Sequence, residues 1–233
     1  MPDQSLANVV PDRIWTLHVP VWFAGVRLRA RSTVVRLEDG SLLFHSPAPP
    51  DERLAEALSA LGSVRWLLVP NCFHQLGAPA ASERFPEARV VGPSSASARN
   101  ERLRLHLDIR GAAFAEQLPE IEALPLDGVP YLDETVLYHR PTATLLGADI
   151  VLRADAGDHW TFRWAGRVTG CYEQVRVPPD VRRKIVDKAA AARSLSAMLE
   201  RPAKRLVVGH SQVIEDACRE QLAEAWRREG VPV

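Results

Sequence analysis

Alternation of apolar and polar residues predicts β-structure in the first third of the chain. The segments RIWTLHVPV (13–21) and VRLRARSTVVRL (26–37) repeat at period two, which is typical of strands that bury one face. LEDGSLLFHS (37–46) then places an Asp-Gly pair between two apolar runs, a common hairpin signal. We therefore expect antiparallel strands over this region.

The apolar period then lengthens to that of a helix. In residues 49–62, Leu54, Leu58 and Leu61 share one face, Asp51 is a candidate N-cap, and Gly62 a stop. Further segments predict a strand buried on both faces, a helix of one or two turns, and another strand: VRWLLVP (64–70), PAASERFP (79–86) and ARVVGP (88–93).

The second half of the chain repeats this order. Four strands are expected, the second and third joined as a hairpin over Pro141 and Thr142: IEALPL (121–126), ETVLYHR (134–140), TATLLGADIVL (142–152) and RLVVGH (205–210). Residues 178–200 predict one helix with Asp180 near its start. Residues 211–230 predict another, with Ile214, Cys218, Leu222 and Trp226 on one face.

Residues 155–175 are harder to interpret. Trp160, Phe162 and Trp164 alternate with other residues, which fits a strand or an aromatic flap. We expect this row to serve packing or an interface, with the lining of a substrate pocket as the alternative.

Strands followed by α/β units, in two successive halves, favour a four-layer αββα sandwich over a Rossmann sheet. Neither a GxGxxG nor a Walker loop is present, so a nucleotide-binding fold loses its main support. At 233 residues, the chain is expected to be a single domain, 1–233.

Composition excludes several classes of partner. The formal net charge is zero and the pI is about 7.1, so neither nucleic acid nor a membrane is an expected partner. The three cysteines are widely spaced and predict neither a disulfide framework nor a thiolate zinc site. With no signal-peptide pattern at the N-terminus and no long apolar run, we expect a cytoplasmic protein that binds a small-molecule substrate or ligand, with a homodimer as an open arrangement.

Three predicted strands each end in a side chain that can bind a divalent metal ion. His74, Asp149 and His210 follow the runs WLLV, TLLGA and LVVG. Ligands collect at strand ends in α/β folds, and two imidazoles with one carboxylate match a catalytic metal site that keeps open positions. The sequence therefore predicts that these three side chains converge on one metal ion. In the alternative, His74 is a core histidine, Asp149 caps a turn, and His210 bonds a loop.

The same segments resemble the metallo-β-lactamase-like superfamily, whose signature is T-H-x-H-x-D-H-x-G-G. Against that pattern, LVPNCFHQLG puts Val69 and Asn71 at two histidines, Phe73 at the aspartate, and His74 at the last histidine. LLGADIVL and VVGHS resemble the later family motifs that contain Asp149 and His210.

The resemblance is closer still to the domain-of-unknown-function family 4336, through FHSPAPP, PNCFHQL, DETVLYHRPTATLLGADIV and VVGHSQVI. It implies the αββα fold and one partial metal site for a single zinc or iron ion. It also implies a mononuclear hydrolase of a small ester, thioester, lactone or phosphoester. A metal-free relative that binds a small molecule or a protein is the alternative.

Other residues near these motifs are pocket candidates without an assigned catalytic role: Asn71, Cys72, Phe73, His45, Asp127, Glu134 and Trp160. Asp127 and Glu134 are the carboxylates considered as replacements for the one lost at Phe73. His45 is read first as a hydrogen-bonded structural histidine, and Cys72 as a small buried filler.

Overall fold

A computed structural model of the protein describes residues 5–233, so residues 1–4, the start of the N-terminal segment discussed above, lie outside it. The chain divides into two compact units. Of the described residues, the first unit holds 5–19 and 31–120, and the second holds 20–30 and 121–233. The single domain expected over 1–233 stays a prediction.

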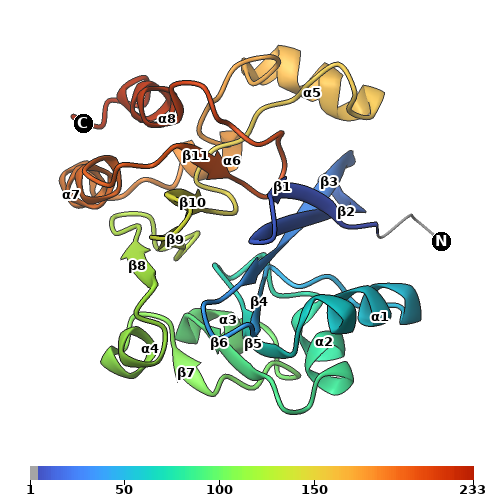
Figure 1. The fold of residues 1–233 in the computed structure, drawn as a ribbon. Coiled ribbons are helices and arrows are strands. Elements are labelled where there is room, and N and C mark those ends of the chain that lie inside the picture. The colour runs from blue at the N-terminus through green and yellow to red at the C-terminus, as the bar shows by residue number, and fades with distance from the viewer. Residues whose placement is uncertain (1–4) are drawn as a thin grey trace. The chain divides into compact units, whose positions relative to one another are not determined.

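A seven-stranded sheet in the order β1 to β7 supplies the strands of the first unit (Figure 1). The strands are β1 (Ala7–Val10), β2 (Ile14–Phe23), β3 (Val26–Arg36), β4 (Leu42–His45), β5 (Val64–Leu68), β6 (Arg89–Gly92) and β7 (Leu107–Asp108). The β2–β3 hairpin end, residues 20–30, belongs to the second unit. β3 and β4 pair antiparallel, whereas β4 to β7 pair parallel. The antiparallel hairpin over the Asp-Gly pair is confirmed, and Gly40 takes the positive φ of 79° that such a turn needs.

The helices of the first unit are α1 (Glu52–Leu61), α2 (Ala78–Arg84), α3 (Ser94–Arg99) and α4 (Ala112–Gln117). α1 begins and ends as its sequence predicts: the Asp51 carboxylate accepts a hydrogen bond from the Leu54 amide, and Gly62 follows its last turn. The core gathers the inward faces of these elements, including Phe44, Leu58 and Leu67. This packing fixes the ends of β4 and β5, from which the first candidate residues project.

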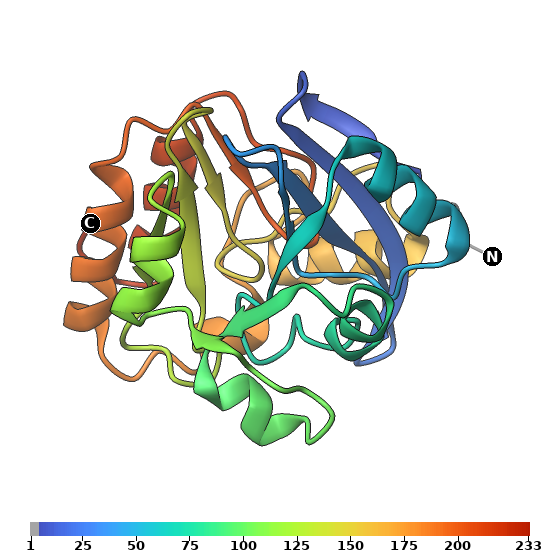
Figure 2. The same cartoon turned by 60° about the horizontal axis from the view of Figure 1, so that its bottom comes forward.

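The second unit is built on a four-stranded sheet in the order β11-β10-β9-β8. Its strands are β8 (Ile121–Pro125), β9 (Thr135–His139), β10 (Thr144–Leu146) and β11 (Arg205–Val207). Its helices are α5 (Trp160–Thr169), α6 (Pro179–Arg182), α7 (Lys188–Leu199) and α8 (Cys218–Arg227). α7 packs on β8 and on α8, which packs on β11, as Figure 2 shows for the orange and red helices beside the strands. The hairpin over Pro141 and Thr142 is confirmed, because β9 and β10 pair antiparallel.

The expectation of a strand or flap at Trp160, Phe162 and Trp164 is wrong, because these residues lie in α5. His159 accepts a hydrogen bond from the Thr161 amide at the start of the helix, and Gly170 ends it with a φ of 77°. Local capping therefore overrides the alternating pattern. Phe162 packs as expected, whereas the two tryptophans are exposed.

The single helix expected over residues 178–200 is divided into α6 and α7. Asp187 takes an extended conformation and accepts a hydrogen bond from the Ala190 amide, so it starts a new helix. The amides of Val186 and Asp187 donate to the Gly128 carbonyl, which draws the connecting segment out of helical geometry.

The last helix starts later than expected. Ile214 exchanges two backbone hydrogen bonds with Leu206, so residues 211–217 do not join α8. Cys218, Leu222 and Trp226 are buried on one face of the helix, as the pattern predicts.

Within residues 5–233, no helix is long and apolar enough to cross a membrane.

Candidate functional site

The loop after β5 carries His74 in the first unit, and a buried asparagine shapes it. The Asn71 side-chain oxygen accepts hydrogen bonds of 2.8 Å from both the Phe73 and His74 amides. This Asx-type turn reverses the chain at the strand end and fixes the backbone of His74. Asn71 is fully buried, so the position where the superfamily signature has a histidine serves loop geometry here.

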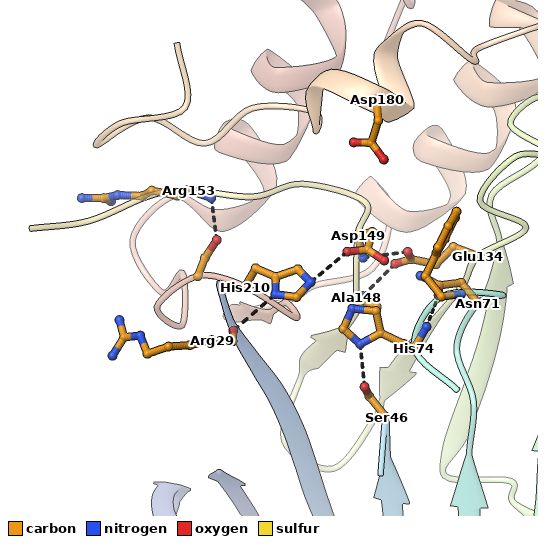
Figure 3. Close-up of polar contacts among 12 residues, drawn as sticks. Arg29, Ser46, Asn71, His74, Glu134, Ala148, Asp149, Arg153, Asp180 and His210 are labelled. Carbon is orange, nitrogen blue, oxygen red and sulfur yellow. Dashed lines mark hydrogen bonds and ion pairs between the residues drawn. The ribbon is translucent and has the colours of Figure 1, made fainter. Parts of the chain in front are cut away.

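Ser46, directly after β4, orients the His74 ring. Its hydroxyl lies 2.6 Å from His74 Nδ1 (Figure 3). Ser46 is itself held firmly, because its amide donates to the Leu68 carbonyl and its carbonyl accepts from the Ser32 hydroxyl. With Nδ1 engaged by the hydroxyl, Nε2 is the ring nitrogen that would serve as a metal ligand.

His45 lies at the end of β4 and is almost fully buried. Its pKa is lowered to about 3, mainly because an imidazolium loses its hydration on burial and to a smaller extent because of the nearby His74 ring. Among the described residues, its Nε2 atom has no hydrogen-bond partner. His45 is therefore a neutral histidine of the core at physiological pH.

Gly77, which falls on the last glycine of the superfamily signature, allows the His74 loop to pack closely. A Cβ atom at this position would lie 2.1 Å from the Pro47 carbonyl oxygen. Of the other candidates on this loop, Cys72 is a buried cysteine, and Phe73 packs under the Arg99 guanidinium, 5.0 Å from the ring centre. Phe73 therefore offers an apolar face where the signature has a carboxylate.

In the second unit, Glu134 holds the turn that carries Asp149. Its two carboxylate oxygens accept hydrogen bonds of 2.8 Å from the Ala148 and Asp149 amides (Figure 3). Glu134 is fully buried. Gly147 leaves room for this arrangement, because a Cβ atom there would lie 3.2 Å from a Glu134 oxygen. Glu134 thus positions the backbone of the Asp149 turn.

Asp149 and His210 face each other at the ends of two neighbouring parallel strands. A carboxylate oxygen of Asp149 lies 3.3 Å from His210 Nε2, and both side chains are largely buried. His210 Nδ1 lies 3.3 Å from the Arg29 carbonyl (Figure 3). Since a carbonyl can only accept, Nδ1 carries the proton, and in the neutral ring Nε2 has a lone pair directed at the carboxylate. Nε2 and the carboxylate oxygen are therefore placed to share a proton or to bind one metal ion together.

The structure thus brings together two of the three predicted ligands within the second unit, while His74 belongs to the first unit. That all three converge on one ion stays a prediction. Asp127 is exposed, and its amide donates to the Ser194 hydroxyl. Trp160 is an exposed residue of α5.

Sequence reasoning missed two contacts of these side chains, Ser46 with His74 and the Arg29 carbonyl with His210. The Ser46 contact had a partial signal. β4 and β5 are parallel neighbours with His45 opposite Leu68, so the residues after both strands lie at one edge of the sheet. The Arg29 contact had no signal in the sequence, because it is made by a main-chain carbonyl and every residue type has one.

Comparisons with known proteins agree with this fold. Residues 11–97 match the family model described as Domain of unknown function (DUF4336). No curated protein matches the chain.

Solved structures of low identity match across nearly the whole chain. A metallo-β-lactamase from Pontibacter korlensis is 12% identical at a TM-score of 0.65 and covers 96% of this chain and 98% of its own. The metallo-β-lactamase FIM-1 from Pseudomonas aeruginosa, in its mono-zinc form, is 10% identical at a TM-score of 0.67 and covers 98% of this chain and 96% of its own. A metallo-β-lactamase from Erythrobacter litoralis is 14% identical at 0.67, covering 96% of both chains. The protein has the metallo-β-lactamase fold, and the fold class expected from its sequence is confirmed.

Proposed function

We propose that the protein is a mononuclear metal-dependent hydrolase. The candidate ligands for one zinc or iron ion are His74, Asp149 and His210. The observation that carries the proposal is the approach of Asp149 to His210 Nε2, with the other ring nitrogen held by a carbonyl. In metal sites, a ligand histidine commonly donates its second ring N–H to a carbonyl or carboxylate, which fixes the tautomer for coordination.

The His74 half of the proposed site follows the same logic. Ser46 engages Nδ1, so that Nε2 is directed away from the hydroxyl, as His210 Nε2 is directed away from the Arg29 carbonyl. A third ligand would come from Asp149, whose turn is fixed by Glu134. Two imidazoles and one carboxylate suit zinc or iron and leave coordination positions for substrate and water.

A bound ion would supply Lewis acidity toward a carbonyl or phosphoryl oxygen and toward water. The chain's own residues hold the ligand atoms: Ser46 and the Arg29 carbonyl orient the two rings, and Glu134 fixes the carboxylate turn. With Phe73 in place of a carboxylate, no acid on the His74 loop is available to bind water. The expected substrates are therefore small esters, thioesters, lactones or phosphoesters that react without a strong general base.

A metal-free function is the second candidate, and the same pair of residues favours it. A proton on His210 Nε2 would satisfy the contact with Asp149 equally well, as an imidazolium–carboxylate ion pair. In that case, the site would bind a small molecule or a partner without catalysing a reaction.

Metal analysis separates the two candidates. Protein purified without chelators is expected to retain about one equivalent of zinc or iron by mass spectrometry. The variants His74→Ala, Asp149→Asn and His210→Ala are expected to lose it, because each removes one of three ligands. His106→Gln is the matched control, since His106 is exposed and its ring accepts a hydrogen bond from the Val90 amide, far in sequence from the three ligands.

Metal-free protein that takes up no zinc, iron or manganese on incubation would rule out the hydrolase proposal. Loss of metal in His210→Ala but not in His74→Ala would rule out the three-ligand site. A screen over the four substrate classes, with the His210→Ala variant as the blank, then identifies the reaction.

A further inference from the structure

An exposed row of large apolar side chains lies on the second unit and includes none of the candidate metal ligands. Trp22 and Phe23 lie at the end of β2, while Trp160, Trp164 and Val168 recur every four residues on one face of α5 (yellow-orange in Figure 1). The three tryptophan side chains are 64–66% exposed. The chain has six tryptophans, so half of them point into solvent. We refer to these five residues as the aromatic ridge.

The two parts of the ridge, on the hairpin and on the helix, are joined at several points. The Trp22 ring meets the His159 ring edge-on at 6.0 Å, and His159 in turn lies 5.8 Å from the Trp160 ring. The Arg27 amide donates to the Thr161 hydroxyl. These contacts hold the hairpin tip beside the first turn of α5.

Basic residues accompany the ridge without an exposed acid. Residues 20–30 and 158–170 contain four arginines, at positions 27, 29, 163 and 167, and a single carboxylate, Asp158. Asp158 is buried and lies 2.8 Å from the Arg29 guanidinium. The next carboxylate along the chain, Glu173, follows the end of α5. These two segments therefore hold three more arginines than carboxylates, although the net charge of the whole chain is zero.

The charge and the shape decide between possible occupants. A two-fold contact between ridges would bring Arg163 and Arg167 toward their own copies, so like charges oppose a homodimer here. The ridge is carried by a hairpin end and one face of a helix, whereas nucleic-acid strands bind in positively charged grooves. Tryptophans beside arginines are instead typical of proteins that rest on the surface of an anionic bilayer.

We propose that the aromatic ridge docks the protein on anionic phospholipid membranes. The indole rings enter the headgroup region, and the arginines pair with lipid phosphates. The proposal departs from the expectation of no membrane partner, which considered the total charge alone. It is independent of the metal-site proposal, because the five ridge residues include no candidate ligand.

Co-sedimentation with lipid vesicles tests the proposal. The full chain is expected to sediment with phosphatidylcholine vesicles that contain a third phosphatidylglycerol, and only weakly with phosphatidylcholine alone. Each arginine near the surface contributes about fivefold to the partition coefficient, so Arg163→Gln with Arg167→Gln should lower it about 25-fold. Raising NaCl from about 0.05 to about 0.5 M should release the protein.

Trp22→Ser with Phe23→Ser, and separately Trp164→Ser, should each abolish sedimentation while leaving circular dichroism unchanged, because these side chains are exposed. Val186→Ser is the matched control, since Val186 is equally exposed but lies outside the ridge. Absence of binding, equal binding to both vesicle types, or unchanged binding by the ridge variants would overturn the proposal. The proposal would also be overturned if the ridge variants changed the self-association of the protein in ultracentrifugation and left vesicle binding unchanged. The same holds if they changed the binding of an oligonucleotide or an acidic peptide instead of vesicle binding.

Discussion

Ser46 is the residue on which the orientation of His74 depends. Its φ of 51° is in the left-handed region, where the backbone of residues other than glycine is strained. Its hydroxyl lies 2.6 Å from His74 Nδ1. Strain at a position that makes a short polar contact indicates that the contact, rather than stability, determines the conformation.

We therefore expect Ser46→Gly to stabilise the backbone while weakening metal binding. Loss of a hydrogen bond to a ligand histidine typically lowers metal affinity about 10- to 100-fold. Zinc titration in competition with a chromophoric chelator measures this change. Ser59→Ala, which removes the hydrogen bond to the Ala55 carbonyl on α1, serves as the control. Unchanged affinity in Ser46→Gly would exclude a positioning role for the hydroxyl.

His45 makes stability depend on pH. Its folded pKa of about 3 is well below its ordinary value of 6.5, so the unfolded chain binds this proton more readily than the folded chain. Stability is therefore highest above pH 6.5 and falls as the pH is lowered toward 3, by up to about 1.4 kcal/mol per pH unit from this group.

Chemical denaturation of His45→Gln between about pH 4 and pH 6 should show a shallower fall than the wild type, because glutamine cannot be protonated in this range. His106→Gln provides the comparison, since His106 is exposed. An identical pH slope for the wild type and His45→Gln would contradict the buried, neutral state of His45.

At the scale of elements, the loop between β5 and α2 depends on Gly77. A Cβ atom there would overlap the Pro47 carbonyl oxygen at 2.1 Å and the Ala48 carbonyl carbon at 2.8 Å. Because both obstacles are backbone atoms, the loop itself must move to admit a methyl group.

Gly77→Ala is thus expected to lower the free energy of unfolding by about 1–3 kcal/mol, as overpacking generally does. It should also reduce metal retention, since the same loop carries His74. Gly157→Ala is the matched control, because a Cβ atom there meets nothing within 4 Å. Equal denaturation midpoints for the two variants would disprove the close approach.

The elements that the sequence predicts correctly are those whose signals are local. α1 has its own cap and stop, and the hairpin over Gly40 has its own turn residues. The errors arise where tertiary contacts intervene. The Gly128 carbonyl divides α6 from α7, and pairing of Leu206 with Ile214 delays α8. The alternating aromatic residues of α5 suggest a strand, because large aromatic side chains are normally taken as the buried positions of an element. In the structure both tryptophans of this helix are exposed, so their spacing does not mark a buried face.

The candidate site divides in the same way. His74, Asp149 and His210 can be identified because strand ends and family motifs are visible in the sequence. Their orienting partners cannot, since Ser46 and Arg29 reach them only through the pairing of strands. The sequence singles out Glu134 as a replacement for the lost acid, whereas in the structure its carboxylate accepts hydrogen bonds from two backbone amides.

At the scale of the whole molecule, metal binding is expected to contribute to stability, because the ligands come from distant parts of the chain. Free zinc at about 100 times its Kd adds about 2.7 kcal/mol, which raises the Tm by roughly 5–10 °C for a chain of this size. Differential scanning calorimetry with zinc, and then with excess chelator, measures the shift and its reversal.

The shift should vanish in His210→Ala and persist in His106→Gln. A Tm that is the same with and without zinc, or a shift that survives loss of His210, would contradict binding at these ligands.

The hydrogen bonds that fix Asp149 and His210 have a consequence for how the protein can diverge. Ala148, Asp149 and Arg29 all contribute main-chain atoms, so exchanging the side chain at position 29 or 148 leaves those bonds in place. We therefore expect that these bonds constrain the residue type at positions 29 and 148 very little, and that they constrain mainly the glutamate at position 134. Relatives that have kept the arrangement will therefore be recognised by a glutamate ahead of β9, even where their neighbouring residues have drifted beyond alignment.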